Sequence, residues 1–428
     1  MADLFATQFP QNIDCTVIYD SDKKYYRPFT NKDFAGGLGG VDAFGRQRVS
    51  NPEKIFASKQ LFDNLPLYFD DIQYSGSGTS STYSSNTASS ILSVSATTAG
   101  KRVRQTYMRF NYQPSKSQLI YITGVLKKSG GGTGIISRMG YFDENDGLFL
   151  QRSGNITSFV RRTNASGSPV DNITTQANWN IDKMDGSGLS GIELDFSKTQ
   201  ILVIDFEWLG VGSIRFGFVI NGIVYYAHQI NNANNLTQVY MSTPNLPIRY
   251  EIENSGTGVA SSLEAICASV TSEGGLELTA TNRYISTDGT PVSATKNKLN
   301  AILAMRLKNE CLDATVDILD LSLLTTSNDN YEWQLILNPS GLNSLSYTPV
   351  PNSVIEYAVP PNGTNISGGY ALAGGYAQAK TDIQSEQLKA MLKLGSSITG
   401  LRDQIVLACY PLGASDSVVH GGINYREF

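Results

Sequence analysis

The sequence predicts an all-β protein with two β-sandwich or jelly-roll-like domains of the lectin-like kind, an extended N-terminal arm and one short C-terminal helix. One observation is that three runs between residues 202 and 227 alternate apolar and polar side chains, as half-buried strands do. The other is composition: only 17% of the 428 residues are charged, while 40 Gly and 22 Tyr are present. This mixture suits short strands joined by tight turns and fits a helical bundle poorly.

The three alternating runs are expected to form a meander at the centre of one sandwich. The Asn-Gly pair at 221–222 suits a two-residue turn with positive φ at both positions, so Ile220 should face Ile223 and Phe218 should face Tyr225. The side chains expected to point into the core are, run by run, Leu202, Ile204, Phe206 and Trp208, then Ile214, Phe216, Phe218 and Ile220, then Ile223, Tyr225 and Ala227.

The join between the first two runs decides which side chains share the polar face. A four-residue loop would place Arg215 beside Phe206 on the apolar face, because a one-residue slip moves a whole strand to the opposite face. A five-residue loop over 209–213 is therefore predicted, with Phe206 opposite Phe216. In this register the polar face carries a row made of Glu207, Arg215 and His228.

Three regions are predicted along the chain. Residues 1–70 form an extended arm and anchor segment, 71–290 the central β-sandwich, and 291–428 a C-terminal β-sandwich. The arm has little periodicity, and the second boundary falls in the polar run 285–298. A helix is expected over 381–395, where an apolar stripe ends at Gly395.

Charge and cysteine usage exclude several classes of function. The net charge is −5 and no long Lys/Arg block occurs, which disfavours a nucleic-acid partner. No apolar run is long enough to insert into a membrane, and no signal peptide is expected. No cofactor or metal site is predicted, since the four cysteines share no ligand spacing with the two histidines; they are expected to be free thiols, namely Cys15, Cys267, Cys311 and Cys409.

Candidates for catalysis are few. No Ser-His-Asp arrangement or G-x-S-x-G motif is found, and the Asp-rich turn 142–147 lacks the spacing of a calcium loop. Asp205 and Glu207 lie two apart on one strand and could serve as the carboxylate pair of a polysaccharide depolymerase. However, Arg215 opposite Glu207 would lower the pKa of that carboxylate, and a structural ion pair is the alternative interpretation.

Binding of a host glycan is a further possibility. Aromatic side chains beside amides and carboxylates suit stacking on sugar rings, and the polar row could supply hydrogen bonds. Packing in the core is the alternative for most of these aromatic residues. The candidates are Trp179, Tyr225, Tyr226 and Tyr240, together with Glu207, Arg215 and His228.

Several stretches together resemble a family of virion structural proteins of tailed bacteriophages and large DNA viruses. They cover about half of the chain and are VDAFGRQRVSNPEKIFASKQ (41–60), TTAGKRVRQTYMRFNYQPSKSQLI (97–120), GYFDENDGLFL (140–150), the central piece from NWNIDKMDGSGLSGIELDFSKTQ through WLGVGSIRFGFVINGIVYYAHQINNANN, PNLPIRYEIEN (244–254) and ITGLRDQIVLACYP (398–411). The resemblance implies a surface, fibre or tail-associated component of the particle, synthesised in the host cytoplasm and located in the virion.

The composition agrees with such a role. A chain poor in charge and histidine, with an extended arm, suits assembly with other copies of itself and with other virion proteins. A homo-oligomeric structural protein is therefore the first hypothesis. A glycan-binding adhesin is the second, and a depolymerase is the third.

Overall fold

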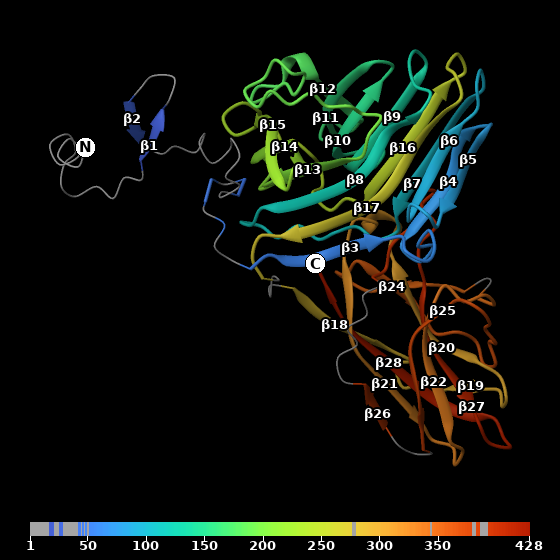
Figure 1. Cartoon of the computed structure of the whole chain (residues 1–428). Coiled ribbons are helices and arrows are strands. Elements are labelled where there is room, and N and C mark those ends of the chain that lie inside the picture. The colour runs from blue at the N-terminus through green and yellow to red at the C-terminus, as the bar shows by residue number, and fades with distance from the viewer. Residues whose placement is uncertain are drawn as a thin grey trace, which may run out of the picture.

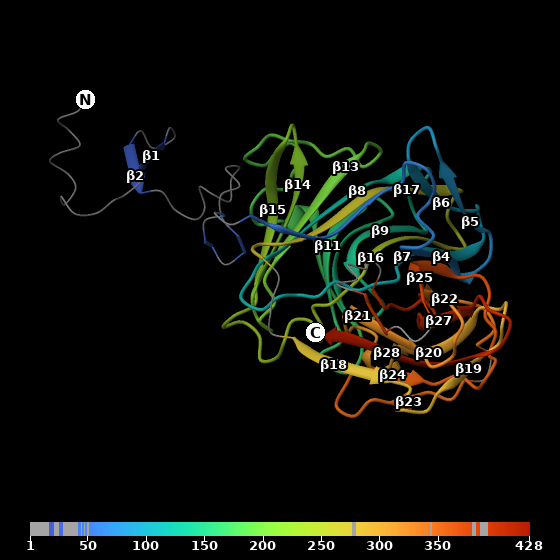
Figure 2. The ribbon, with the colours of Figure 1, turned by 90° about the horizontal axis from the view of Figure 1, so that it is seen from below.

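The computed structural model describes residues 17–20, 25–28, 42–43, 45–46, 48, 51–275, 280–342, 345–378, 382–385 and 393–428. The chain is all-β, as predicted: helical residues in this described part are limited to two short 3₁₀ turns, η2 (Gln176–Asn178) and η3 (Asn309–Cys311). Figures 1 and 2 show the strands grouped into a central sandwich and a C-terminal unit, with a small hairpin apart from both. That hairpin is β1 (Val17–Asp20) paired with β2 (Tyr25–Pro28).

The central sandwich consists of two antiparallel sheets. One is seven-stranded, in the order β12 (Val170–Thr175), β11 (Ile156–Thr163), β10 (Gly147–Ser153), β9 (Ile135–Phe142), β16 (Ile248–Ser255), β7 (Ala99–Thr106) and β4 (Phe69–Gly76). The other is eight-stranded, in the order β15 (Ile223–Asn231), β14 (Ser213–Ile220), β13 (Gln200–Phe206), β8 (Gln118–Ser129), β17 (Ser261–Ser272), β6 (Ser89–Val94) and β5 (Thr79–Ser84), with β3 (Glu53–Lys59) also paired to β17. Strands β12 and β15 are thus the edge strands on one side of the sandwich (Figure 1).

The C-terminal unit also has two sheets. The five-stranded sheet runs β18 (Thr281–Ser286), β28 (Ser417–Glu427), β21 (Val316–Thr325) and β26 (Asp382–Ser385), with β19 (Val292–Ala294) paired to β28. The six-stranded sheet runs β23 (Thr348–Pro349), β24 (Ile355–Ala358), β20 (Asn300–Leu307), β27 (Ile405–Pro411), β22 (Tyr331–Leu337) and β25 (Tyr370–Ala377). Pairing therefore joins β3 to the central sandwich and β18 to the C-terminal unit, whereas the sequence placed the boundaries at 70 and 290.

The helix predicted over 381–395 is wrong where the structure describes it. Asp382–Ser385 form β26, which pairs with β21 so that Leu321 lies opposite Ser385. Residues 386–392 lie outside the described residues. Pairing with a neighbouring strand supplies backbone partners, and such tertiary contacts override a weak helical propensity.

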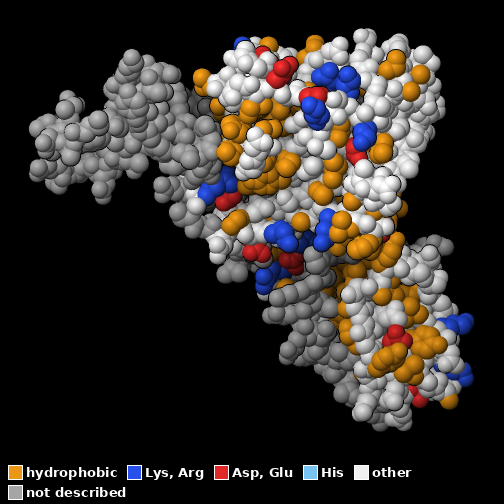
Figure 3. Space-filling view, in the orientation of Figure 1, with side chains coloured by type: hydrophobic (Ala, Val, Ile, Leu, Met, Phe, Trp, Pro, Cys, Tyr) orange, Lys and Arg blue, Asp and Glu red, His pale blue; other side chains and the backbone are white. Residues whose placement is uncertain are grey.

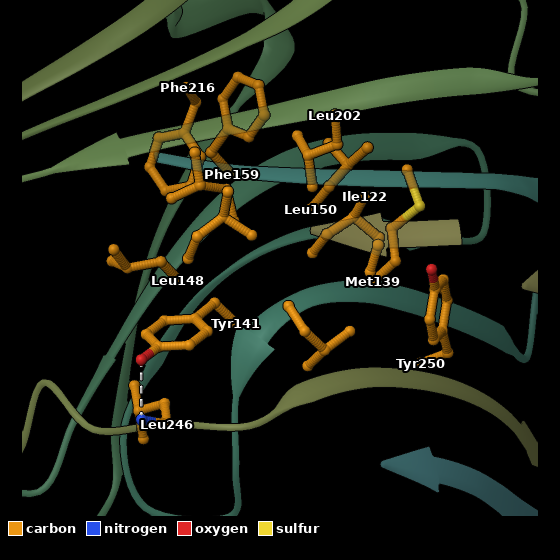
Figure 4. Packing of buried hydrophobic residues seen from close by; sticks show 14 of the residues in the cluster. Ile122, Met139, Tyr141, Leu148, Leu150, Phe159, Leu202, Phe216, Leu246 and Tyr250 are labelled. Carbon is orange, nitrogen blue, oxygen red and sulfur yellow. Dashed lines mark hydrogen bonds between the residues drawn. The ribbon is translucent and has the colours of Figure 1, made fainter. Parts of the chain in front are cut away.

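The core of the central sandwich lies between its two sheets, and Figure 4 shows part of it. Ile122 and Leu202 point inward from one sheet and meet Met139 and Leu150 from the other; all four are fully buried. The hydroxyl of Tyr141 accepts a hydrogen bond from the backbone N–H of Leu246 at 3.0 Å, so the polar end of this buried ring is satisfied. The apolar alternation read from the sequence is what closes this core.

Candidate functional site

The predicted meander is present as β13, β14 and β15, and its turn is confirmed. Asn221 and Gly222 have φ of 53° and 78°, which places both central residues of the turn in the left-handed region. Ile220 lies opposite Ile223, as the turn predicts. Phe218 lies opposite Tyr225, so the register near the turn is also as predicted.

The join between β13 and β14 is longer than predicted. Phe206 lies opposite Ile214 rather than Phe216, a shift of two residues that keeps every side chain on its expected face. Trp208 leaves the strand, because its indole N–H donates to the carbonyl of Met241 at 3.1 Å. The residue opposite Arg215 is consequently Asp205, and Glu207 lies in the loop.

A β-bulge moves His228 off the polar face. The pairing shifts between Phe216, which lies opposite His228, and Gly217, which lies opposite Tyr226. Ala227 is the extra residue, and its carbonyl accepts hydrogen bonds from the backbone N–H groups of residues 181 and 182 at 3.1 and 3.0 Å. A Cβ at Gly217 would lie 2.3 Å from the Tyr225 carbonyl oxygen, so only glycine fits there. The predicted row of Glu207, Arg215 and His228 is therefore wrong, because a bulge places successive side chains out of alternation.

The polar face instead carries a cluster around Asp205, whose side chain is fully buried. The carboxylate accepts hydrogen bonds from Ser117 Oγ at 2.7 Å and from the Tyr226 hydroxyl at 2.6 Å. Arg215 from β14 and Arg48 from the arm form ion pairs with it. We call Asp205, Arg48, Arg215, Tyr226 and Ser117 the aspartate cluster. Its carboxylate is fully occupied by donors within the chain.

The aspartate cluster also fastens the arm to the sandwich. Arg48 bridges from Asp205 to Glu273 just beyond β17, with both N–O distances at 2.5 Å. The backbone carbonyl of Ala43 accepts a hydrogen bond from Ser213 Oγ at 2.6 Å. The described part of the arm therefore lies against the ends of β13 and β14 of its own chain.

Glu207 does not form a catalytic pair with Asp205. Burial raises the pKa of Glu207, and its Oε2 is buried without a hydrogen-bond partner among the described residues. Asp205 has no oxygen left for a nucleophilic or basic role, since both oxygens already accept from neighbouring side chains. The two carboxylates thus lack the division into acid and nucleophile that glycoside hydrolysis needs.

Most of the predicted glycan-contacting side chains are inaccessible. Trp179 is 3% exposed and stacks on Phe159 with ring centroids 4.2 Å apart, so it belongs to the core. Tyr226 and Tyr240 are also buried, and the guanidinium of Arg215 lies 4.4 Å from the ring of Tyr226. Core packing, the alternative weighed from the sequence, is what the structure shows for these aromatic rings.

One polar site that the structure presents is a hollow of about 410 Å³ at the open edge of the sandwich. It lies between the edge strands β12 and β15, and we call it the edge hollow. Ligand sites commonly have volumes of roughly 300–1,000 Å³. Its lining contains five side-chain amides and no carboxylate: Arg161, Asn172, Thr174, Asn180, His228, Gln229, Ile230, Asn231 and Asn235.

The amides of the edge hollow use only part of their hydrogen-bonding capacity. Gln229 Nε2 donates to Asn231 Oδ1 at 2.7 Å, and Asn235 Nδ2 donates to the Asn231 carbonyl at 2.9 Å. A side-chain amide offers two N–H donors and a carbonyl oxygen with two lone pairs. The amides can therefore offer both N–H donors and carbonyl acceptors to a ligand.

His228 is the one residue of the predicted polar row that lines the hollow. Its ring is parallel to that of Phe159, with centroids 6.5 Å apart. Burial lowers the pKa of His228 to about 4, so the ring is neutral near pH 7. Because Nδ1 accepts the backbone N–H of Asn180 at 3.3 Å, the proton of the neutral ring lies on Nε2.

Asn180 connects the hollow to the edge strand. Its Nδ2 donates to the carbonyl of Gln229 at 2.8 Å, and its Oδ1 accepts the Gln229 N–H at 2.9 Å. The side chain thus pairs with β15 as a short strand would and covers part of an open sheet edge. Sequence reasoning missed this role, although the asparagine-rich run 231–235 was a visible signal for the hollow.

The structure also bears on metal ligands, cysteines and membrane-spanning helices. Within the described ranges no group of three potential metal ligands comes together. Cys409 is buried and Cys267 and Cys311 are partly buried, all as free thiols, while Cys15 lies outside the described residues. No helix in the part of the chain that the structure covers is long and apolar enough to cross a bilayer.

Comparisons with known proteins concern the fold. No protein-family model matches the chain, and no curated protein matches it. Solved structures that are similar include an endo-1,3-β-glucanase from Streptomyces sioyaensis (TM-score 0.35, 10% identity, 53% of this chain and 98% of that chain) and a legume lectin-like domain from Entamoeba histolytica (0.30, 10%, 50% and 96%). A third is the CBM2 module of the evolved Dit of Lactobacillus casei BL23 phage J-1 (0.33, 8%, 51% and 95%). The strand pairing of this chain shows by itself that the central unit is a two-sheet antiparallel β-sandwich.

Proposed function

We propose that this protein is a surface component of a virus particle that acts by binding, and that the edge hollow of its central sandwich binds glycan. The particle assignment rests on the sequence resemblance to virion structural proteins. The glycan assignment is carried by one observation, the amide-lined hollow without carboxylates. The two parts are tested separately.

The chemistry of the edge hollow matches a polyhydroxylated ligand. Sugar hydroxyls both donate and accept hydrogen bonds, and amide side chains offer both functions at one position. Neutral His228 adds the Nε2–H donor, and Thr174 adds a hydroxyl. The site is polar, open to solvent and anchored on two edge strands, so its geometry is set by the sheets rather than by a long loop.

Binding to a set of immobilised glycans tests the proposal. The double substitution Asn231→Ala with Asn235→Ala should weaken binding about tenfold or more, because each lost hydrogen bond contributes about 1 kcal/mol. Tyr284→Ala is a matched control: it changes another hollow of about 410 Å³, on the C-terminal unit. Loss of binding in the control with no loss in the double variant would move the site away from the edge hollow.

A depolymerase role is tested with the same preparations. Neither the wild-type chain nor the Asp205→Asn variant should shorten a polysaccharide, because Asp205 serves as an ion-pair partner. Shortening of a capsular polysaccharide by the wild-type chain would replace the binding proposal with an enzymatic one.

The particle proposal predicts assembly. Low charge density supports it, since Figure 3 shows basic and acidic side chains in small mixed groups between wide uncharged areas. The ion pairs of Arg48 support it too, because they hold this part of the arm at a fixed point on the sandwich. Light scattering should show a closed homo-oligomer, and peptide mass spectrometry should find the chain in purified particles. A monomer that is absent from particles would contradict both expectations.

A further inference from the structure

We infer that the edge hollow selects anionic saccharides and that Arg161 receives the acidic group. This inference rests on the proposed glycan function and names the ligand class of that same site. The ligand is a pyranose ring or short chain that carries a carboxylate or a sulfate ester.

Arg161 differs from most other arginines of the central sandwich. The following arginines of the sandwich and the arm each form an ion pair with a carboxylate: Arg46, Arg48, Arg102, Arg104, Arg109, Arg138, Arg162, Arg215 and Arg249. No carboxylate lies within 4.0 Å of the Arg161 guanidinium among the residues that the structure describes. Its guanidinium donates instead to an amide, from Nη1 to Asn232 Oδ1 at 2.5 Å.

The Arg161 guanidinium is also partly withdrawn from water. Its Nε atom is buried and makes no hydrogen bond within the described part of the chain. Burial lowers the pKa of Arg161, whereas the carboxylate-paired Arg162 next to it has a raised pKa. A desolvated cation without a counter-ion is unfavourable, so an anion entering the hollow would gain a strong charge-assisted contact.

The position of Arg161 directs this charge toward a ligand. It lies on β11 next to the edge strand β12, and it reaches Asn232, at the end of β15 in the opposite sheet. The guanidinium therefore spans the gap between the two sheets at the edge hollow, which it lines. With no acidic side chain in the lining, a bound carboxylate or sulfate meets no like charge there.

On the opposite face of β11, Arg162 has the carboxylate partner that Arg161 lacks among the described residues. It is the next residue, and its guanidinium pairs with Asp171 on the opposite face of the same sheet. The two arginines share strand, charge and length but differ in partner. They therefore form a matched pair for experiment.

Calorimetric titration of the full chain tests the inference with four probes: digalacturonic acid, a sulfated disaccharide, a neutral disaccharide, and free acetate or sulfate. We expect either acidic disaccharide to bind at least about tenfold more tightly than the neutral one, with a preference that falls as salt rises. Arg161→Gln should abolish this preference, while Arg162→Gln should keep it. Asn235→Asp, which adds a negative charge to the hollow, should also abolish it and covers the case in which Arg161→Gln does not fold.

The outcomes separate the two proposals. Equal affinity for neutral and acidic disaccharides would overturn the inference and leave the glycan function intact. Free acetate or sulfate binding as tightly as the acidic sugars would overturn it as well, because the site would then recognise a bare anion. Failure of every saccharide to bind would overturn the glycan function itself.

Discussion

Two polar sites in the same sandwich differ in how their charges are balanced. In the aspartate cluster, Asp205 is surrounded by two guanidinium groups and two hydroxyls. In the edge hollow, Arg161 has an amide partner and no carboxylate among the described residues. The first arrangement satisfies its charges within the chain and holds structure together. The second leaves capacity for a ligand, which is why the two sites should respond differently to substitution.

The largest expected effect is in the aspartate cluster. Asp205→Ala should lower the free energy of unfolding by about 3–5 kcal/mol, because it leaves buried Arg215 without its main counter-charge. Urea denaturation measures this change. Asp195→Ala is the control, since that carboxylate is exposed and should change stability by less than about 0.5 kcal/mol. A cost at Asp205 as small as that at Asp195 would show that the cluster is not structural.

A smaller loss is expected when the arm is released. Arg48→Ala removes the bridge between Asp205 and Glu273 but leaves Arg215 in place, so a cost of about 2 kcal/mol is expected. Limited proteolysis should then cleave the chain before residue 51 faster than in the wild type. Arg46→Ala, whose side chain is 53% exposed, should have almost no effect on either measurement. Equal cleavage rates in all three proteins would contradict the fastening role.

Acid should lower the stability of the protein, because His228 beside the edge hollow is buried as a neutral ring. A histidine with a folded pKa of about 4 and an ordinary unfolded pKa of 6.5 binds fewer protons when folded, so stability is highest above pH 6.5 and falls as the pH drops toward 4. We expect a loss on the order of 1–2 kcal/mol between pH 6.5 and 5. His228→Gln should lose less over this interval in denaturation experiments. Parallel pH profiles for the two proteins would refute the assignment.

The smallest effect is expected at Asn180. Asn180→Ala removes two hydrogen bonds to Gln229, but the freed backbone groups can reach water, so a cost of about 0.5–1 kcal/mol is expected. Hydrogen exchange of the Gln229 amide should speed up, while that of core strand β13 should not. An unchanged Gln229 rate would mean that Asn180 does not protect the edge.

Much of the fold could be predicted because alternation reports burial directly. Leu202, Ile204 and Phe216 are fully buried, as their period-two spacing predicts. The Asn-Gly turn fixed the register near Ile220 because its geometry is local. The join at Trp208 could not be predicted, since the Met241 carbonyl that its indole contacts is 33 residues away.

The sites were harder to predict than the fold. The partner of Asp205 in the arm, Arg48, lies 157 residues away and has no local signature. The bulge at Ala227 reverses the face of His228, and alternation alone does not indicate an inserted residue. The amides of the edge hollow come from three separate stretches, at 172, 180 and 229–235, so only the asparagine-rich run 231–235 was visible in the sequence.

The bulge at Ala227 separates the surroundings of two nearby side chains. Tyr226 and His228 are two positions apart, yet one serves the aspartate cluster and the other serves the edge hollow. A strand without the bulge would present both side chains to the same face, so both would lie in the same site. With it, the side chain that lines the edge hollow and the side chain that binds Asp205 point to opposite faces of the sheet, although only one residue separates them. One inserted alanine thus lets a substitution at either position be made without placing a new side chain in the other site.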